Sequence, residues 1–169
     1  PFLERAGSFA ALALAPGSLL TAAVKTGEPP APSGGTPRAD LIDPEVKAVT
    51  ALAGVDGFSE YDAVILCDVA ALAPSQARLL AGFVEAGGGL LVAPGPRANA
   101  GFYNGWLTAA GAPVLPTRLL RQMVVAKDAG EVKPALTTFT HPALRLVADA
   151  KQSDLGSLIF SRYWQLADN

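Results

Sequence analysis

Residues 61–95 carry the clearest pattern in the chain and read YDAVILCDVAALAPSQARLLAGFVEAGGGLLVAPG. The segment Tyr61–Cys67 is apolar on both faces after its first two residues, which is typical of a buried parallel strand. A helix is predicted over Pro74–Ala86, because proline is favoured in the first helical turn and apolar residues recur at helical spacing. Gly87–Gly89 ends that helix, and Gly89–Ala93 is predicted to be a second buried strand. Strand, helix and strand in this order predict a βαβ unit with parallel strands. The predicted inward face of the helix holds Leu79, Leu80, Phe83 and Val84.

The rest of the chain alternates between further predicted helices, strands and loops. Proline and glycine crowd the segment Thr26–Arg38, which indicates an exposed loop. The alternation predicts an α/β fold, a three-layer sandwich with a mostly parallel sheet and helices on both faces. Helices are expected at Phe2–Ala13, Glu45–Ala53, Asn99–Ala110 and His141–Ala150, and strands at Leu19–Lys25, Arg118–Lys127 and Leu158–Leu166.

The composition bounds the size and class of the protein. The chain has 169 residues, of which 50% are hydrophobic and 17% charged, so it can bury the core of one domain and is not intrinsically disordered. The net charge of -2 supplies no basic excess for phosphate contacts, which argues against nucleic-acid binding. A single cysteine and a single histidine exclude an internal disulfide framework and a site built from two histidines. We therefore expect no metal site and no cofactor.

The ends of the chain raise the question of a membrane segment. The sequence begins at Pro1, so we expect residues 1–169 to be a single domain that was processed or cut from a longer protein. Residues Ala6–Val24 carry no charge, but Pro16-Gly17-Ser18 interrupts the run, and a helix, a turn and a strand explain it better than a membrane span. A signal peptide, with Arg5 before an apolar stretch, is the alternative interpretation. No other segment has the length and apolarity to cross a bilayer, which predicts no direct membrane insertion.

The chain resembles a known superfamily in two blocks, Tyr61–Arg78 and Phe83–Gly95. These blocks are similar to the class I glutamine amidotransferase-like superfamily, so the resemblance implies a flavodoxin-like sheet. The pattern also occurs in other flavodoxin-like domains, including trehalose-utilisation-type proteins. The narrower resemblance is to the non-catalytic type found in large bacterial membrane-anchored proteins with a BatA-type membrane region, and it includes Tyr103-Asn104, His141–Leu144 and Phe160–Trp164. The resemblance extends roughly over Phe2–Leu166 and implies further strands before and after residues 1–169.

The same resemblance implies where a catalytic nucleophile would lie. Catalytic relatives carry a cysteine on a tight turn between a strand and a helix, and the corresponding turn in this chain, Pro94–Arg97, holds no cysteine or serine. Cys67 ends the preceding strand without flanking glycines and is interpreted as a small buried residue. His141 is the only histidine, and Pro142 follows it where catalytic relatives have a nearby carboxylate. We therefore expect no catalytic residues, with a Cys67–His141 pair as the alternative.

A ligand site, if the domain has one, is expected beyond the carboxyl ends of the strands, as in other open α/β sheets. Gly87–Gly89 does not contribute a phosphate loop, because these glycines follow a helix and precede a strand, which is the reverse of the order in dinucleotide-binding motifs. Arg97 and Asn99 are the two residues expected to bind an anion at this site. The candidate ligand-binding residues at these strand ends are Asp68, Gly95, Arg97, Asn99, Tyr103 and Asn104.

The expected function follows from the resemblance and from the turn without a nucleophile. We expect a non-enzymatic binding or interaction domain of a larger, bacterial, membrane-anchored protein of the cell envelope. Its partners would be other domains of that protein or envelope proteins. Two alternatives stay open: a cysteine hydrolase or amidotransferase-like enzyme that uses Cys67 and His141, and a sensor that binds a small ligand at the strand ends.

Overall fold

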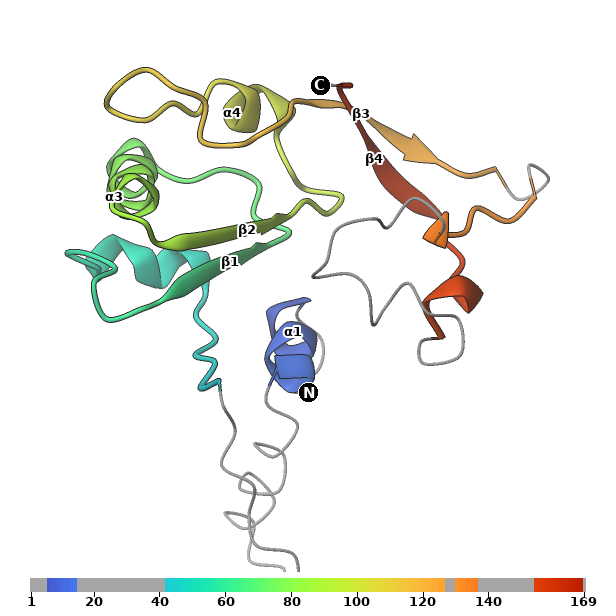
Figure 1. Ribbon diagram of the computed structural model, residues 1–169, viewed down its shortest axis with the longest axis horizontal. Helices are drawn as coiled ribbons and strands as arrows, with labels where there is room; N and C mark the ends of the chain where they lie inside the picture. The colour runs from blue at the N-terminus through green and yellow to red at the C-terminus, as the bar shows by residue number, and fades with distance from the viewer. Residues whose placement is uncertain (1–5, 15–41, 127–129, 137–153, 169) are drawn as a thin grey trace, which may run out of the picture. The chain divides into compact units, whose positions relative to one another are not determined.

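The computed structural model describes residues 6–14, 42–126, 130–136 and 154–168, and this part of the chain has a mixed α/β fold (Figure 1). Its strands form two separate sheets of two strands each. The chain divides into two compact units, one with residues 1–99 and 105–114, the other with residues 100–104 and 115–169. The elements in chain order are α1 (Ala6–Leu14), η2 (Val49–Gly54), β1 (Ala63–Cys67), α3 (Pro74–Glu85), β2 (Gly89–Ala93), α4 (Ala100–Asn104), β3 (Leu119–Val124), η5 (Asp154–Ser157) and β4 (Arg162–Leu166).

The first unit contains the βαβ unit that the sequence predicts, but the prediction that both strands are buried is wrong. Leu66 is the one buried residue of β1, and Leu91 of β2 is 58% exposed, because the sheet has two strands in the described residues. Strands β1 and β2 are parallel, in a register that runs from Ala63 opposite Gly89 to Cys67 opposite Ala93. Helix α3 connects them, and Pro74 occupies its first turn as expected. Gly87 ends the helix with φ of 98°, which a glycine adopts without the steric cost of a Cβ atom. The N–H groups of Gly87 and Gly88 donate to carbonyls of the last helical turn, so the predicted glycine cap is confirmed.

The core of the first unit lies on a narrower face of α3 than the sequence suggests. Leu80 is fully buried, and Ala77 and Ala81 are buried beside it at the spacing of one helical face. Leu79, which is expected from the sequence to point inward, is 38% exposed, because it lies outside the face that these three residues form. The buried indole of Trp106 donates from Nε1 to the carbonyl oxygen of Ala77 at 2.9 Å and completes the packing against α3.

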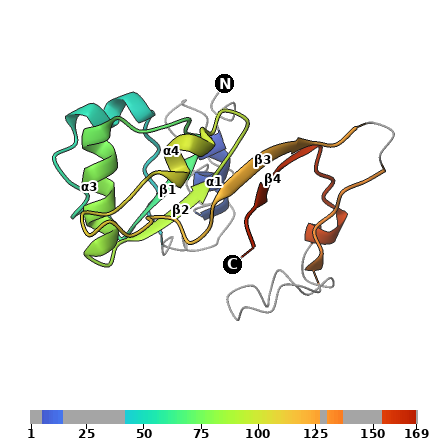
Figure 2. The ribbon, with the colours of Figure 1, turned by 90° about the horizontal axis from the view of Figure 1, so that it is seen from above.

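The second unit is built around an antiparallel pair. Strands β3 and β4 are antiparallel neighbours (Figure 2). In their register, Gln122 lies opposite Trp164 and Met123 opposite Tyr163. Both strands are expected from the sequence, although β3 begins and ends inside the predicted range. Trp164 is the most buried residue of β4, as its alternation predicts for a residue on the packed face.

Two predicted helices are shorter than expected. The helix predicted over Asn99–Ala110 ends at Asn104, because Gly105 follows and residues 107–113 form a turn that Gly111 closes with φ of 82°. Of the predicted helix Glu45–Ala53, only the second half is helical, as the 3-10 turn η2. The preceding residues have no regular secondary structure, and no side chain caps the start of η2.

The predicted sheet is only partly matched. One sheet is parallel and the other antiparallel, and neither has more than two strands in the described residues. The predicted strand Leu19–Lys25, loop Thr26–Arg38 and helix His141–Ala150 lie outside the described residues. The predicted helix Phe2–Ala13 is observed as α1 from Ala6 onward, and its first residues lie outside the described part. Helix α1 contacts β1. In the ranges that the structure describes, no helix combines the length and the apolarity that a membrane span needs.

Candidate functional site

The carboxyl ends of β1 and β2 are joined by a pair of opposite charges. Asp68 directly follows β1, and its backbone N–H continues the ladder by donating to the carbonyl of Ala93 at 3.0 Å. The carboxylate of Asp68 accepts two hydrogen bonds from Arg97, at 2.9 Å from the backbone N–H and at 3.0 Å from Nε. Arg97 lies just beyond β2, so the ion pair holds the two strand ends together.

Gly95 is required by the same arrangement. A Cβ atom at position 95 would overlap the carboxylate of Asp68 and lie 2.6 Å from its Cβ. The turn after β2 therefore comes closer to Asp68 than a residue with a side chain allows. We call Asp68, Gly95 and Arg97 the strand-end site.

The two charges of the strand-end site differ in exposure. The side chain of Asp68 is 20% exposed, whereas that of Arg97 is 72% exposed. Within the part of the chain that the structure describes, Asp68 is the one partner of the Arg97 guanidinium. The site thus has a sheltered carboxylate and a solvent-facing guanidinium, whose Nε–H donates to that carboxylate.

The backbone of Asp68 is in the left-handed region, with φ of 50°. Among residues other than glycine, aspartate and asparagine adopt this conformation most readily. No other described residue apart from glycines has a positive φ. The chain therefore turns sharply at the end of β1, and this turn directs the carboxylate toward the end of β2.

The remaining candidate ligand residues have different surroundings. Asn99 is exposed in the first unit, and its backbone N–H donates to the carbonyl of Ala70 at 2.9 Å. Tyr103 and Asn104 belong to α4 in the second unit, and Tyr103 is 2% exposed. The amide of Asn104 donates to the carbonyl oxygen of Leu119 and accepts from its N–H, both at 2.8 Å. The Asn104 side chain therefore joins α4 to the start of β3, and the buried Tyr103 ring contacts the ring of Phe102.

Cys67 lies immediately before Asp68 and is partly buried. Burial raises the pKa of its thiol, which disfavours the thiolate that a nucleophile needs. Its predicted partner in the alternative catalytic pair, His141, lies outside the described residues. No cluster of residues able to hold a metal ion occurs in the described ranges.

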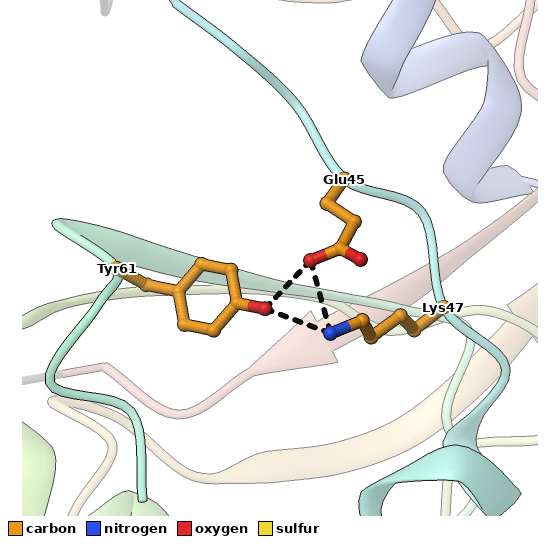
Figure 3. A network of polar contacts seen from close by, with 3 residues as sticks. All are labelled: Glu45, Lys47 and Tyr61. Carbon is orange, nitrogen blue, oxygen red and sulfur yellow. Dashed lines mark hydrogen bonds and ion pairs between the residues drawn. The ribbon is translucent and has the colours of Figure 1, made fainter.

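A second polar cluster, which the sequence did not indicate, joins Glu45, Lys47 and Tyr61 (Figure 3). The Tyr61 hydroxyl donates to Oε2 of Glu45 at 2.6 Å and accepts from Nζ of Lys47 at 2.8 Å, and the two charged groups are 2.9 Å apart. The hydrogen bond with Tyr61, followed by that with Glu45, raises the pKa of Lys47. The hydrogen bond from Tyr61, followed by that from Lys47, lowers the pKa of Glu45.

This cluster stabilises charge at the surface and does not activate a base. A raised pKa keeps Lys47 protonated, so its amine is not a nucleophile near neutral pH. The cluster connects the segment before η2 to the residue two positions before β1. The sequence carried no signal for it, because the predicted helix over Glu45–Ala53 would turn the side chains of Glu45 and Lys47 to different faces.

Comparison with known proteins adds no relative. The chain matches no family model, no curated protein and no solved structure. The function must therefore be argued from the residues described above.

Proposed function

We propose that this chain is a non-enzymatic binding or interaction domain. The observation that carries the proposal is the turn after β2, where the backbone N–H and Nε of Arg97 both donate to the carboxylate of Asp68. An acyl-transfer enzyme needs its nucleophile and free N–H donors directed at the substrate oxyanion. In this turn, no nucleophile is present and the N–H of Arg97 is already used within the protein.

The state of the thiol supports the same proposal. A catalytic cysteine is activated by a lowered pKa, whereas burial raises that of Cys67. Cys67 also lies within the ladder, opposite Ala93, and not on a turn that would project its side chain. The alternative enzyme that uses Cys67 and His141 has no comparable support.

The wider context is part of the proposal and rests on the resemblance of the sequence. We assign the domain to the non-catalytic, class I amidotransferase-like type, with a three-layer, flavodoxin-like sheet of which β1 and β2 are two strands. It would belong to a larger bacterial membrane-anchored protein with a BatA-type membrane region. Its partners would be other domains of that protein or proteins of the cell envelope.

Hydrolysis assays test the absence of catalysis. The full chain is incubated with glutamine and with a panel of esters and amides, alongside Cys67→Ala. We expect both proteins to release product at the rate of the buffer. Hydrolysis by the unsubstituted chain that is lost in Cys67→Ala, with the circular dichroism spectrum unchanged, would contradict the proposal and favour the cysteine enzyme.

One observation favours a second candidate, a sensor of small ligands at the strand ends. The guanidinium of Arg97 faces solvent while its inner nitrogen is fixed by Asp68. Thermal unfolding in the presence of a metabolite library would distinguish a sensor from a module that binds only proteins, because a ligand that binds the native state raises the unfolding temperature.

A further inference from the structure

The Arg97 guanidinium has more hydrogen-bonding capacity than the fold uses. A guanidinium carries five N–H donors in a planar fork, and Nε supplies one of them. That donor goes to Oδ2 of Asp68 at 3.0 Å. The four N–H groups on the terminal nitrogens have no partner in the described ranges, and the side chain is 72% exposed. The outer edge of the fork therefore presents one parallel pair of donors to solvent, with one N–H from each terminal nitrogen.

The same contacts limit the freedom of this fork. Asp68 is fixed by its own N–H, which donates to Ala93, and its carboxylate holds both the backbone and Nε of Arg97. A free arginine side chain loses much rotamer entropy when it binds a ligand, whereas one that is already attached at Nε loses less. Gly95 keeps the turn close to Asp68 and so maintains this arrangement.

We infer that the strand-end site binds the carboxylate group of a ligand through the terminal nitrogens of Arg97. This inference rests on the proposed binding function and names the chemistry of its ligand. The carboxylate would accept two parallel hydrogen bonds, the geometry in which arginine and a carboxylate fit each other best. The carboxylate can come from a small organic acid or from the C-terminus of a polypeptide.

Short-range hydrogen bonds to the guanidinium, and not long-range charge, would hold the ligand at the strand-end site. Asp68 balances the charge of Arg97, so the strand-end site has no net charge before a ligand binds. Each negative charge on the ligand is attracted by Arg97 and repelled by Asp68. The chain also has a net charge of -2, which gives no long-range attraction for anions.

Titration of the isotope-labelled full chain with sodium acetate, followed by NMR, tests the inference. Acetate replaces chloride at constant ionic strength, and the signals of Gly95 N–H, Arg97 N–H and Arg97 Nε–H are followed. We expect saturable shifts of these signals. Arg97→Gln should weaken acetate binding by roughly tenfold or more, because two charge-assisted hydrogen bonds are lost. Arg97→Lys should also weaken it, since an ammonium keeps the charge but has no fork.

Arg121 provides a matched control within the same chain. It is an exposed arginine of β3 whose Nε donates to Oε1 of Gln165 at 3.0 Å, so it too is held through its inner nitrogen, but by a neutral group. Arg121→Gln should leave the acetate shifts at Gly95 and Arg97 unchanged.

Two further probes identify the source of the carboxylate. Acetyl-alanyl-alanine is compared with acetate and with its own C-terminal amide. Tighter binding of the peptide acid indicates a polypeptide C-terminus, and equal binding indicates a small organic acid. Binding of the amide as strong as that of the acid would overturn the inference.

The absence of saturable acetate shifts, or equal acetate binding by Arg97→Gln, would overturn the carboxylate site. Either result leaves the proposed non-enzymatic role standing, because that role fails only if Cys67-dependent hydrolysis is found. Running the glutamine assay on the same labelled samples keeps the two outcomes separate.

Discussion

Replacement of Gly95 by alanine tests the close approach between the two strand ends. The added Cβ would overlap the carboxylate of Asp68 and lie 2.6 Å from its Cβ, far inside van der Waals contact. Gly95 does not have a positive φ, so alanine fits its backbone and the steric overlap is the cost of the change. Asp68 can move away only by giving up two hydrogen bonds from Arg97.

The expected loss combines two effects. Forcing a methyl group into a packed position costs about 1–3 kcal/mol. The loss of a hydrogen bond to a charged group costs about 1.5–3 kcal/mol when its partner stays sheltered, and less when water replaces it, as at this partly exposed site. Because relaxation relieves one effect at the expense of the other, we expect Gly95→Ala to lower the free energy of unfolding by about 2–4 kcal/mol.

Urea denaturation followed by tryptophan fluorescence measures this loss, since the buried Trp106 lies in the same unit as Gly95. The Asp68→Gly background removes the carboxylate and suits the left-handed backbone at position 68. In that background, Gly95→Ala should cost less than about 0.5 kcal/mol, because the two sites are coupled through the overlap. An equal loss in both backgrounds would refute the steric explanation.

Gly82 supplies the matched control for this experiment. It lies in α3 of the same unit, is exposed, and has no atom within 4 Å of the position where a Cβ would be added. Gly82→Ala should therefore stabilise the chain by about 0.5–1 kcal/mol through helix propensity. A destabilisation similar to that of Gly95→Ala would mean that the unit tolerates no added methyl group, whatever its position.

Three further predictions concern other contacts. Trp106→Phe keeps most of the buried ring but loses the donor to Ala77, so urea denaturation should show a loss of about 1–2 kcal/mol, and an unchanged midpoint would contradict a stabilising role for that bond. Asn104→Ala removes both hydrogen bonds to Leu119 and should speed hydrogen exchange of the Leu119 amide severalfold, whereas an unchanged rate would show that the side chain does not protect it. Burial raises the pKa of Cys67, so iodoacetamide should modify it more slowly in the native chain than in urea at every pH tested. Rapid alkylation of the native chain below neutral pH would contradict a raised pKa of Cys67. Because burial favours the neutral thiol, the stability contributed by Cys67 is fully present below its ordinary pKa of 9.0 and is lost as the pH rises through the folded pKa.

The sequence predicted best where local rules act together. In the βαβ unit, an apolar strand, a proline at the helix start and a glycine at its end all indicate the same structure, and tertiary contacts do not oppose them. The cap at Gly87 is a clear case, because its positive φ is a local requirement that only a few residue types meet. These features need no information from distant parts of the chain.

The features that the sequence missed depend on residues far apart in the chain. Asp68 and Arg97 are both candidate ligand residues from the sequence, but their pairing joins positions 29 residues apart and has no periodic signal. The contact between Asn104 and Leu119 is similar, because it joins α4 to a strand that begins 15 residues later. The helical periodicity of residues 99–110 gives no information on the hydrogen bonds between the Asn104 side chain and the backbone of β3.

The two charged residues of the strand-end site differ in how much of each side chain the fold uses. Asp68 suits the left-handed turn after β1, and its carboxylate fixes the turn after β2, so folding alone accounts for its presence. Arg97 is different, because any residue other than proline would supply the backbone N–H that Asp68 accepts. The terminal nitrogens of the guanidinium take part in neither of these two hydrogen bonds, and they are the part of the strand-end site where we propose that a carboxylate binds.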